Sequence, residues 1–163
     1  MEIKEHIEEI MRYSKSRNMT VSTAESCTGG LIAHYITNVP GASSFFSGGV
    51  VAYSNEIKTR VLGVRKDTLE KYGAVSEDCA REMAEGVAKL FKSDFAVATT
   101  GIAGPSGGTK DKPVGLVYIG YYILGEITVE RKIFTGNREE IKEKIAKRAI
   151  EELDRKMVYT LKL

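Results

Sequence analysis

The chain has 163 residues, of which 42% are hydrophobic and 28% are charged, and its formal net charge is +2. This composition is typical of a globular protein, and the near balance of charges gives no electrostatic case for nucleic acid or a membrane as partner. No apolar run approaches the roughly 20 residues of a transmembrane helix. Residues 1–17 lack the basic-then-apolar pattern of a signal peptide. We therefore expect a cytoplasmic protein.

Cysteine and histidine are scarce. The two cysteines, Cys27 and Cys79, do not form a disulfide framework, which favours a reduced compartment. The only histidines are His6 and His34, and the chain has neither a CxxC nor an HExxH motif. We expect no metal site and no cofactor.

Helical and strand periodicities alternate along the chain. Ile3, Ile7, Ile10 and Met11 predict an amphipathic helix over residues 2–17. Next in chain order, the patterns predict a strand over 20–23, a helix over 31–36 and a strand-like run over 45–51 that Gly48-Gly49 interrupts. Helices follow over 55–62, over 66–72 and from Ser76 onward. The chain then continues with a strand over 94–99, an antiparallel hairpin of 114–124 and 126–134, and a last helix capped by Gly136-Asn137. This order predicts an α/β fold, a three-layer α/β/α sandwich with a mixed sheet, in a single domain over 1–163.

The most informative stretch is 41–58, which brings two adjacent serines, Ser43 and Ser44, together with Tyr53 and Lys58 around a strand-like run. A lysine held neutral by its surroundings can activate a serine, and a tyrosine can relay the proton. The alternative is ordinary loop chemistry followed by a solvated lysine at a helix start.

A second candidate is the small-residue turn 24–30 between a strand and a helix. Ser26, Thr28 and Gly29 lie in this turn, whose backbone N–H groups suit an anion such as phosphate or carboxylate. The turn lacks the lysine of a Walker loop and the spacing of GxGxxG. The alternative is a tight turn in which Ser26 or Thr28 only caps the helix.

Two further features point to a ligand. The loop 100–108, beginning with Thr100 and Gly101, has four glycines and a proline directly after a buried strand, which favours a backbone-rich binding loop over a mobile surface loop. Arg138 stands at a helix start, where a cation opposes the helix dipole, so it suggests an anion to bind. A plain surface arginine is the alternative.

Because ligands bind beyond the carboxyl ends of strands in open α/β sheets, we expect loops 24–30, 53–58 and 100–108 to form one site.

These motifs together resemble the C-terminal domain of the competence-damage-inducible CinA proteins. The resemblance rests on AESCTGG at 24–30, YSNEIK at 53–58, GAVS at 73–76, TGIAGPSGG at 100–108, KPVG at 112–115 and GNR at 136–138, and it covers nearly the whole chain. It implies a nicotinamide-nucleotide amidase, which converts nicotinamide mononucleotide into nicotinic acid mononucleotide and ammonia. The extra N-terminal domain of longer CinA proteins has no room here, so its pyrophosphatase activity is not expected.

The resemblance also implies roles for single residues. Its serine–tyrosine–lysine set falls on Ser44, Tyr53 and Lys58, with Ser44 as nucleophile, Tyr53 as proton relay and Lys58 as general base. Its substrate contacts fall on Ser26, Thr100 and Arg138. Free lysine has a pKa of about 10.4, so Lys58 must be desolvated or lie near another cation to act as a base. The apolar residues Phe45-Phe46 and Val50-Val51 are the candidates for desolvating it.

Two other function classes stay open at this point. One is a non-catalytic module that senses pyridine nucleotides, and the other is a competence-related partner protein without a small ligand. The intact serine, tyrosine and lysine favour the amidase. We further expect a homo-oligomer that binds the mononucleotide, with neither nucleic acid nor membrane as partner.

Overall fold

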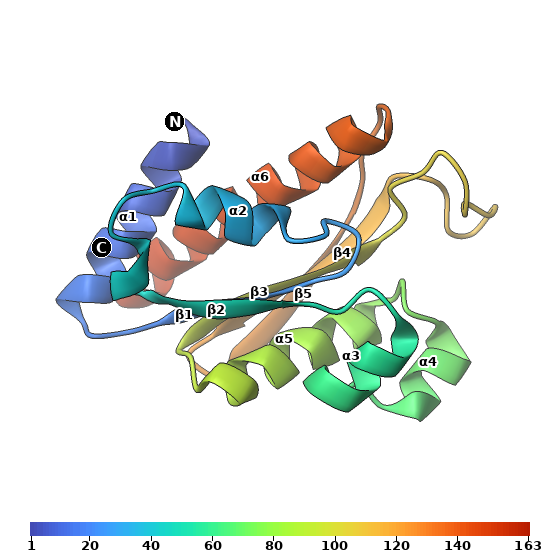
Figure 1. Ribbon diagram of the computed structural model, residues 1–163, viewed down its shortest axis with the longest axis horizontal. Coiled ribbons are helices and arrows are strands. Elements are labelled where there is room, and N and C mark those ends of the chain that lie inside the picture. The colour runs from blue at the N-terminus through green and yellow to red at the C-terminus, as the bar shows by residue number, and fades with distance from the viewer.

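Six α-helices, one short 3-10 helix and five strands make up the chain in the computed structural model, which describes residues 1–163 (Figure 1). They follow in the order α1 (Ile3–Ser16), β1 (Val21–Glu25), α2 (Leu31–Thr37), η1 (Ala42–Ser44), β2 (Phe46–Val51), α3 (Asn55–Leu62), α4 (Lys66–Tyr72), α5 (Glu77–Phe91), β3 (Phe95–Gly101), β4 (Leu116–Ile123), β5 (Glu126–Ile133) and α6 (Arg138–Leu161).

The strands form one mixed sheet in the order β2-β1-β3-β4-β5. β2, β1 and β3 run parallel, whereas β4 and β5 are antiparallel to their neighbours. Figure 1 shows α1, α2 and α6 on one face of the sheet and α3, α4 and α5 on the other. The predicted three-layer α/β/α domain with a mixed sheet is therefore confirmed.

Side chains of the central strand β3 pack into two separate cores, because successive side chains of a strand point to opposite faces of the sheet. Phe95 and Val97 join the core cluster under α1, α2 and α6, while Ala96 and Ala98 join the smaller cluster against α5. α5 lies close to the sheet, because a Cβ at Gly120 would come within 2.6 Å of the Ala80 carbonyl oxygen. The small residues on this face therefore set how near α5 can approach.

Sequence signals placed several element ends correctly. The helices α3 and α4 cover the predicted ranges and each ends at a glycine, Gly63 and Gly73. Ser54 and Ser76 are the N-caps of α3 and α5, where each hydroxyl accepts a backbone N–H at 3.2 Å. Asn137 caps α6 through a capping box.

Two strands differ from their predicted form. β1 continues two residues beyond Thr23, because Ala24 and Glu25 pair with β2 on one side and β3 on the other. Gly48 and Gly49 lie inside β2 rather than interrupting it. No helix has both the length and the apolar character needed to cross a membrane.

Candidate active site

The carboxyl ends of the three parallel strands lie at the same edge of the sheet. Glu25 at the end of β1 is level with Val51 of β2 and Thr99 of β3, so the loops that follow these strands meet, as predicted. They enclose a cavity of about 340 Å³, which is within the range of small-molecule pockets. Its lining residues are Ser26, Cys27, Tyr53, Asn55, Lys58, Ala74, Val75, Thr100, Gly101, Ile102, Ala103, Gly104, Ser106, Gly107 and Arg138.

Six of the nine site residues named from the sequence line this cavity. They are Ser26, Tyr53, Lys58, Thr100, Gly101 and Arg138. Cys27, Asn55, Ala74, Val75 and Ser106 also line it, although the sequence analysis gave them no part in binding. Ser106 stood within the predicted 100–108 loop and Asn55 within the YSNEIK motif, so both could have been found there. Nothing in the sequence marks Ala74 and Val75 as a wall of the pocket.

Ser44, predicted as the nucleophile, does not line this cavity, so the structure does not bring it together with Tyr53 and Lys58. It closes η1 before β2 begins, whereas Tyr53 and Lys58 follow the end of β2. A strand of six residues spans roughly 20 Å, so Ser44 lies at the opposite edge of the sheet, where its hydroxyl donates to the Gly41 carbonyl at 2.7 Å. Of the predicted desolvating flank, Phe45 packs in the core under α6, whereas Val50 packs against the cluster on the α5 side of the sheet.

Lys58 is the buried cation of the pocket. Its side chain projects from α3, and the residue is only 1% exposed. The amine donates one hydrogen bond, to the Tyr53 carbonyl oxygen at 3.0 Å. Burial lowers the pKa of Lys58, and the nearby side chains of Cys79 and Cys27 oppose that shift. A lysine in this setting is shifted toward the neutral form that acts as a base.

Ser26 is the serine that shares the pocket with Lys58. It follows β1 directly, and its backbone N–H donates to the Thr99 carbonyl at 3.0 Å, which holds the turn against β3. Its hydroxyl has no hydrogen-bond partner within the protein. No hydrogen bond joins it to the Lys58 amine either, and such contacts often tighten only when substrate is bound.

The turn after Ser26 does not offer the predicted anion site. The second and third backbone N–H groups of α2, those of Ile32 and Ala33, donate to the Glu25 carboxylate at 2.9 and 3.0 Å. Glu25 is 1% exposed, so an internal carboxylate already occupies the positive end of the helix. The turn is therefore built around an anion that belongs to the protein.

Thr28 and Gly29, which were predicted to bind the ligand, do not line the cavity. The Thr28 hydroxyl donates to Glu25 at 2.6 Å and lies 2.8 Å from the Thr99 hydroxyl, so it serves the structure of the turn. Gly29 adopts a left-handed conformation with φ of 61° on the exposed side of the turn.

Arg138 connects three segments at the mouth of the pocket. Its guanidinium donates to the Gly104 carbonyl at 2.6 Å and to the Tyr53 hydroxyl at 3.0 Å. The Tyr53 side chain is exposed, and Arg138 itself is accessible to solvent. A fixed, solvent-accessible guanidinium suits an anionic group on a ligand.

The loop after β3 presents backbone donors to the same cavity. The Thr100 hydroxyl is engaged, because it donates to the Ala74 carbonyl at 2.7 Å and so holds the 73–76 segment as one wall. In contrast, the backbone N–H groups of Ala103, Gly104, Ser106 and Gly107 donate to no acceptor in the protein. The prediction of a backbone-rich loop fits this arrangement.

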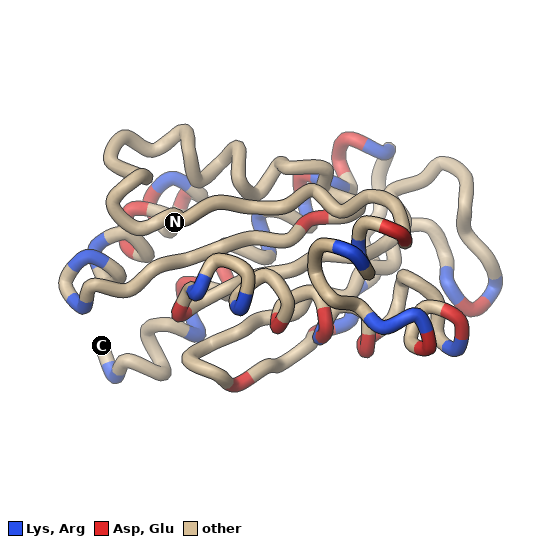
Figure 2. Tube along the Cα trace, turned by 60° about the horizontal axis from the view of Figure 1, so that its bottom comes forward, with Lys and Arg blue, Asp and Glu red and all other residues tan.

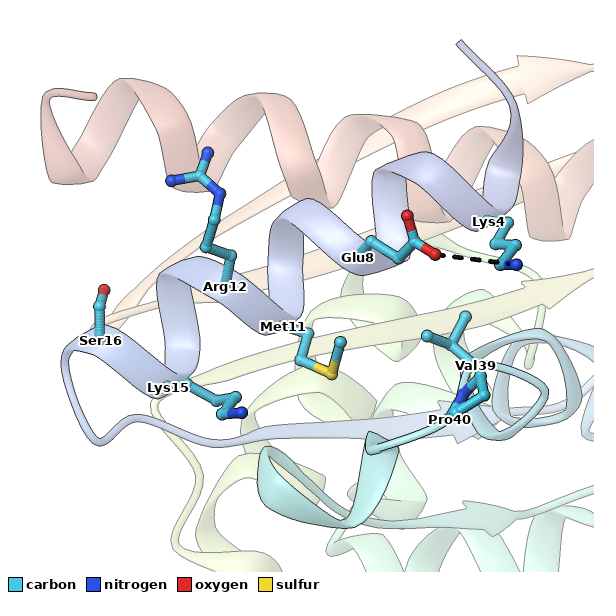
Figure 3. Close-up of a pocket in the computed structure, with 8 residues that line it drawn as sticks. All are labelled: Lys4, Glu8, Met11, Arg12, Lys15, Ser16, Val39 and Pro40. Atoms are coloured by element: carbon cyan, nitrogen blue, oxygen red, sulfur yellow. Dashed lines mark ion pairs between the residues drawn. The ribbon is translucent and has the colours of Figure 1, made fainter.

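A larger hollow of about 750 Å³ lies elsewhere, between α1 and residues 39–40 (Figure 3). In that view Met11 and Lys15 extend from α1 toward Val39 and Pro40. Its one serine, Ser16, donates to the Tyr13 carbonyl at 3.0 Å. No buried base accompanies that serine, so the smaller pocket at the strand ends is the candidate active site.

Comparison with known proteins gives the family. The model of the CinA C-terminal domain matches residues 3–157. This chain belongs to that family. A CinA-like protein of Thermotoga maritima is 53% identical over 146 residues, which cover 90% of this chain and 36% of the relative. The CinA C-terminal domain described here thus spans about a third of the length of the curated relatives it matches.

Solved structures agree in fold as well as in sequence. Competence damage-inducible protein A of Klebsiella pneumoniae superposes with a TM-score of 0.93 at 35% identity, covering 97% of this chain and 98% of that chain. A competence/damage inducible protein of Agrobacterium tumefaciens gives 0.89 at 40% identity over 93% of each chain.

Proposed function

We propose that this CinA C-terminal domain hydrolyses the carboxamide of nicotinamide mononucleotide to give nicotinic acid mononucleotide and ammonia. The observation that carries the proposal is the joint presence, in one pocket, of a serine hydroxyl without a partner and a buried lysine. Ser26 supplies the hydroxyl and Lys58 the base, which is the combination that amide hydrolysis without a metal requires. The motif resemblance supplies the choice of substrate.

The reaction proceeds through an acyl-enzyme. Neutral Lys58 accepts the proton of the Ser26 hydroxyl, and the oxygen attacks the carboxamide carbon. The tetrahedral intermediate collapses with cleavage of the C–N bond, and the Lys58 ammonium returns its proton to the leaving nitrogen, which departs as ammonia. Water then attacks the ester while Lys58 accepts one of its protons and passes it to the Ser26 oxygen as the C–O bond breaks. The acid product leaves and releases its remaining proton to solvent as it ionises to the carboxylate.

The oxyanion of each intermediate requires preorganised donors. The backbone N–H group of Cys27 comes directly after the nucleophile, belongs to a residue that lines the cavity, and donates to no acceptor in the protein. We therefore assign the oxyanion to this group. The internal hydrogen bonds from Thr28 to Glu25 and Thr99 hold this part of the turn rigid.

The phosphate of the substrate is assigned to the mouth of the pocket. Arg138 offers a guanidinium there, and the N–H groups of the loop from Ala103 to Gly107 offer neutral donors. Since Glu25 occupies the N-terminus of α2, the phosphate does not bind at the 24–30 turn.

The test compares two serines by ammonia release from nicotinamide mononucleotide. We expect Ser26→Ala to lower kcat by about a thousandfold or more while still binding substrate in calorimetry. Ser44→Ala should keep kcat within about twofold of the unmodified chain, because it lies roughly 20 Å away. Ser16→Ala, in the other hollow, is the matched control.

The outcomes separate the remaining alternatives. An inactive Ser44→Ala variant together with an active Ser26→Ala variant would restore Ser44 as the nucleophile, as predicted from the sequence. Binding of the mononucleotide by the unmodified chain with no release of ammonia would favour a nucleotide-sensing module. The absence of both binding and turnover would remove the mononucleotide as ligand.

A further inference from the structure

The parallel half of the sheet is nearly free of charge, and Figure 2 shows long uncharged stretches of chain there. β1, β2 and β3 contain one charged residue between them, Glu25, in a chain that is 28% charged. This residue is only 1% exposed and stands directly before Ser26. A buried carboxylate costs free energy unless hydrogen bonds compensate for it, so its place beside the nucleophile needs an explanation.

The Glu25 carboxylate closes a ring around the part of the turn that faces the pocket. Its Oε1 atom accepts a hydrogen bond from the Thr28 hydroxyl at 2.6 Å. The two residues inside this ring, Ser26 and Cys27, are the residues of the 24–30 turn that line the cavity. Glu25 and Thr28 do not line it. The carboxylate therefore acts on the reacting groups only through the backbone that the ring encloses.

Thr99 fixes the same ring to β3 at two points. Its backbone carbonyl accepts the Ser26 N–H at 3.0 Å, and its hydroxyl lies 2.8 Å from the Thr28 hydroxyl. Because Thr28 gives its one hydroxyl hydrogen to Glu25, the Thr99 hydroxyl is the donor in the second contact. The Cys27 N–H, to which the oxyanion is assigned, lies between these two attachments, so both of them set its direction.

The orientation of the carboxylate is fixed from the other side by α2. Oε1 of Glu25 accepts the Ile32 N–H in addition to the Thr28 hydroxyl, and Oε2 accepts the Ala33 N–H. All three contacts need an acceptor. An amide in place of the carboxylate keeps one acceptor oxygen and turns an NH₂ group toward a donor, so its shape is conserved but the hydrogen bonds are not.

We propose that Glu25 is a positioning residue, which holds the Ser26 hydroxyl and the Cys27 N–H in the geometry of attack. It acts through the hydroxyls of Thr28 and Thr99. This role deepens the proposed hydrolysis and rests on Ser26 being the nucleophile. A displacement of about 1 Å in the reacting groups can cost about a hundredfold in rate, so loss of the ring should lower kcat. KM should change little, because none of the three supporting residues lines the cavity.

The most direct variant is Thr28→Val, which keeps the branched shape of the side chain and removes its hydroxyl. We expect kcat for ammonia release from nicotinamide mononucleotide to fall about tenfold to a hundredfold, with KM within about threefold. Thr28→Ser keeps the hydroxyl and should recover kcat to within about threefold of the unmodified chain. Glu25→Gln should resemble Thr28→Val, and the double variant should be little worse than either single one, because residues that act as a unit are not additive.

A second pair of hydroxyls in the fold supplies the matched control. Ser22 and Ser93 are buried, lie 2.6 Å apart and are separated by 71 residues, as Thr28 and Thr99 are. Ser22 is nevertheless roughly 10 Å before Glu25 along β1. Ser22→Ala should lower the midpoint of chemical denaturation about as much as Thr28→Val and keep kcat within about twofold. If Thr28 only stabilises the fold, the two variants will lose the same share of kcat.

A second measurement follows Ser26 without the substrate. A sulfonyl fluoride sulfonylates an activated serine hydroxyl and releases fluoride, and mass spectrometry of peptides measures the rate at Ser26. We expect Thr28→Val and Glu25→Gln to slow this labelling at least about tenfold, and Ser22→Ala to leave it unchanged. Circular dichroism establishes that each variant folds, and Glu25→Gln decides the matter if Thr28→Val does not fold.

The outcomes separate the positioning role from the proposed hydrolysis. Normal kcat and normal labelling in the folded variants overturn the positioning role and leave the hydrolysis intact. An unmodified chain that releases no ammonia, but whose labelling is slowed by Glu25→Gln and not by Ser22→Ala, overturns the hydrolysis and leaves the positioning role. An unmodified chain that releases no ammonia and is not labelled at Ser26 overturns both.

Discussion

At the scale of single residues, Lys58 is the proposed base, because it is buried and its side chain also lines the pocket. The neutral amine is the reactive form, and burial lowers its pKa, so the base is available at a lower pH than in a free lysine. The same shift in the pKa of Lys58 makes the stability of the fold depend on pH. Because this pKa is lower in the folded than in the unfolded chain, its contribution to stability is fully present above the pKa of the unfolded chain, and it is lost as the pH falls through the pKa of the folded chain.

We predict that kcat/KM for the mononucleotide rises with pH along an acid limb that Lys58 sets, with an apparent pKa below the usual 10.4 of lysine. Lys58→Arg should lose activity about a thousandfold at every pH, because a guanidinium does not deprotonate. A pH–rate profile of both proteins measures this. Lys66→Arg, on the exposed start of α4, should keep the original profile. An unchanged acid limb in Lys58→Arg would assign the limb to another group.

Among elements, the contact between α1 and α6 combines a shared hydrophobic core with one partly buried polar pair. His6 Nδ1 lies 2.6 Å from Asp154 Oδ2, while the other oxygen of Asp154 is buried without a partner. Burial raises the pKa of Asp154, and the hydrogen bond from His6 opposes that shift. The pair therefore offsets part of the cost of placing a carboxylate between two helices.

Removal of His6 should destabilise this contact. We predict that His6→Ala lowers the free energy of unfolding by about 1–3 kcal/mol, because both Asp154 oxygens then lack a partner. Chemical denaturation measures the change, and a double-mutant cycle with Asp154→Ala isolates the coupling. Lys4→Ala breaks the exposed pair with Glu8 on the same helix and should cost less than about 1 kcal/mol. Equal losses for the two variants would mean that burial of the His6 pair adds nothing.

Local patterns in the sequence specified the elements well and the site only in part. A helix cap or a terminal glycine is recognised from a few neighbouring residues of the sequence, which is why α3 and α4 were placed correctly. The sequence analysis grouped Ser44 with Tyr53 because the two residues are near in sequence, while a whole strand separates them in space. Ser26 reaches the pocket only because β1 and β2 run parallel and in register, which depends on long-range pairing.

The 24–30 turn shows a second limit of local patterns. A small-residue turn before a helix looks the same whether its anion is a ligand or a carboxylate of the protein. Only the burial of Glu25 against Ile32 and Ala33 decides between them, and that contact forms across seven and eight residues of folded chain.

At the scale of the whole molecule, the pocket is a meeting of segments that are distant in sequence. Arg138 at the start of α6 binds Tyr53, 85 residues away, and Gly104, 34 residues away. These two contacts join the loop after β2 to the loop after β3, so one side chain both closes the mouth of the pocket and presents a cation there. Removal of the Arg138 side chain should therefore weaken binding mainly of substrates that carry a phosphate.

We predict that Arg138→Ala raises KM for nicotinamide mononucleotide by about tenfold to a hundredfold, as expected for hydrogen bonds to a charged group worth about 1.5–3 kcal/mol. The effect on nicotinamide riboside should stay within about threefold, because the riboside has no phosphate to lose. Arg138→Lys should recover part of the affinity, since it keeps the charge without the planar fork. Arg131→Ala, an exposed arginine on β5, is the control. Parallel changes in KM for both substrates would show that Arg138 acts by holding Tyr53 and Gly104 in place and not by binding phosphate.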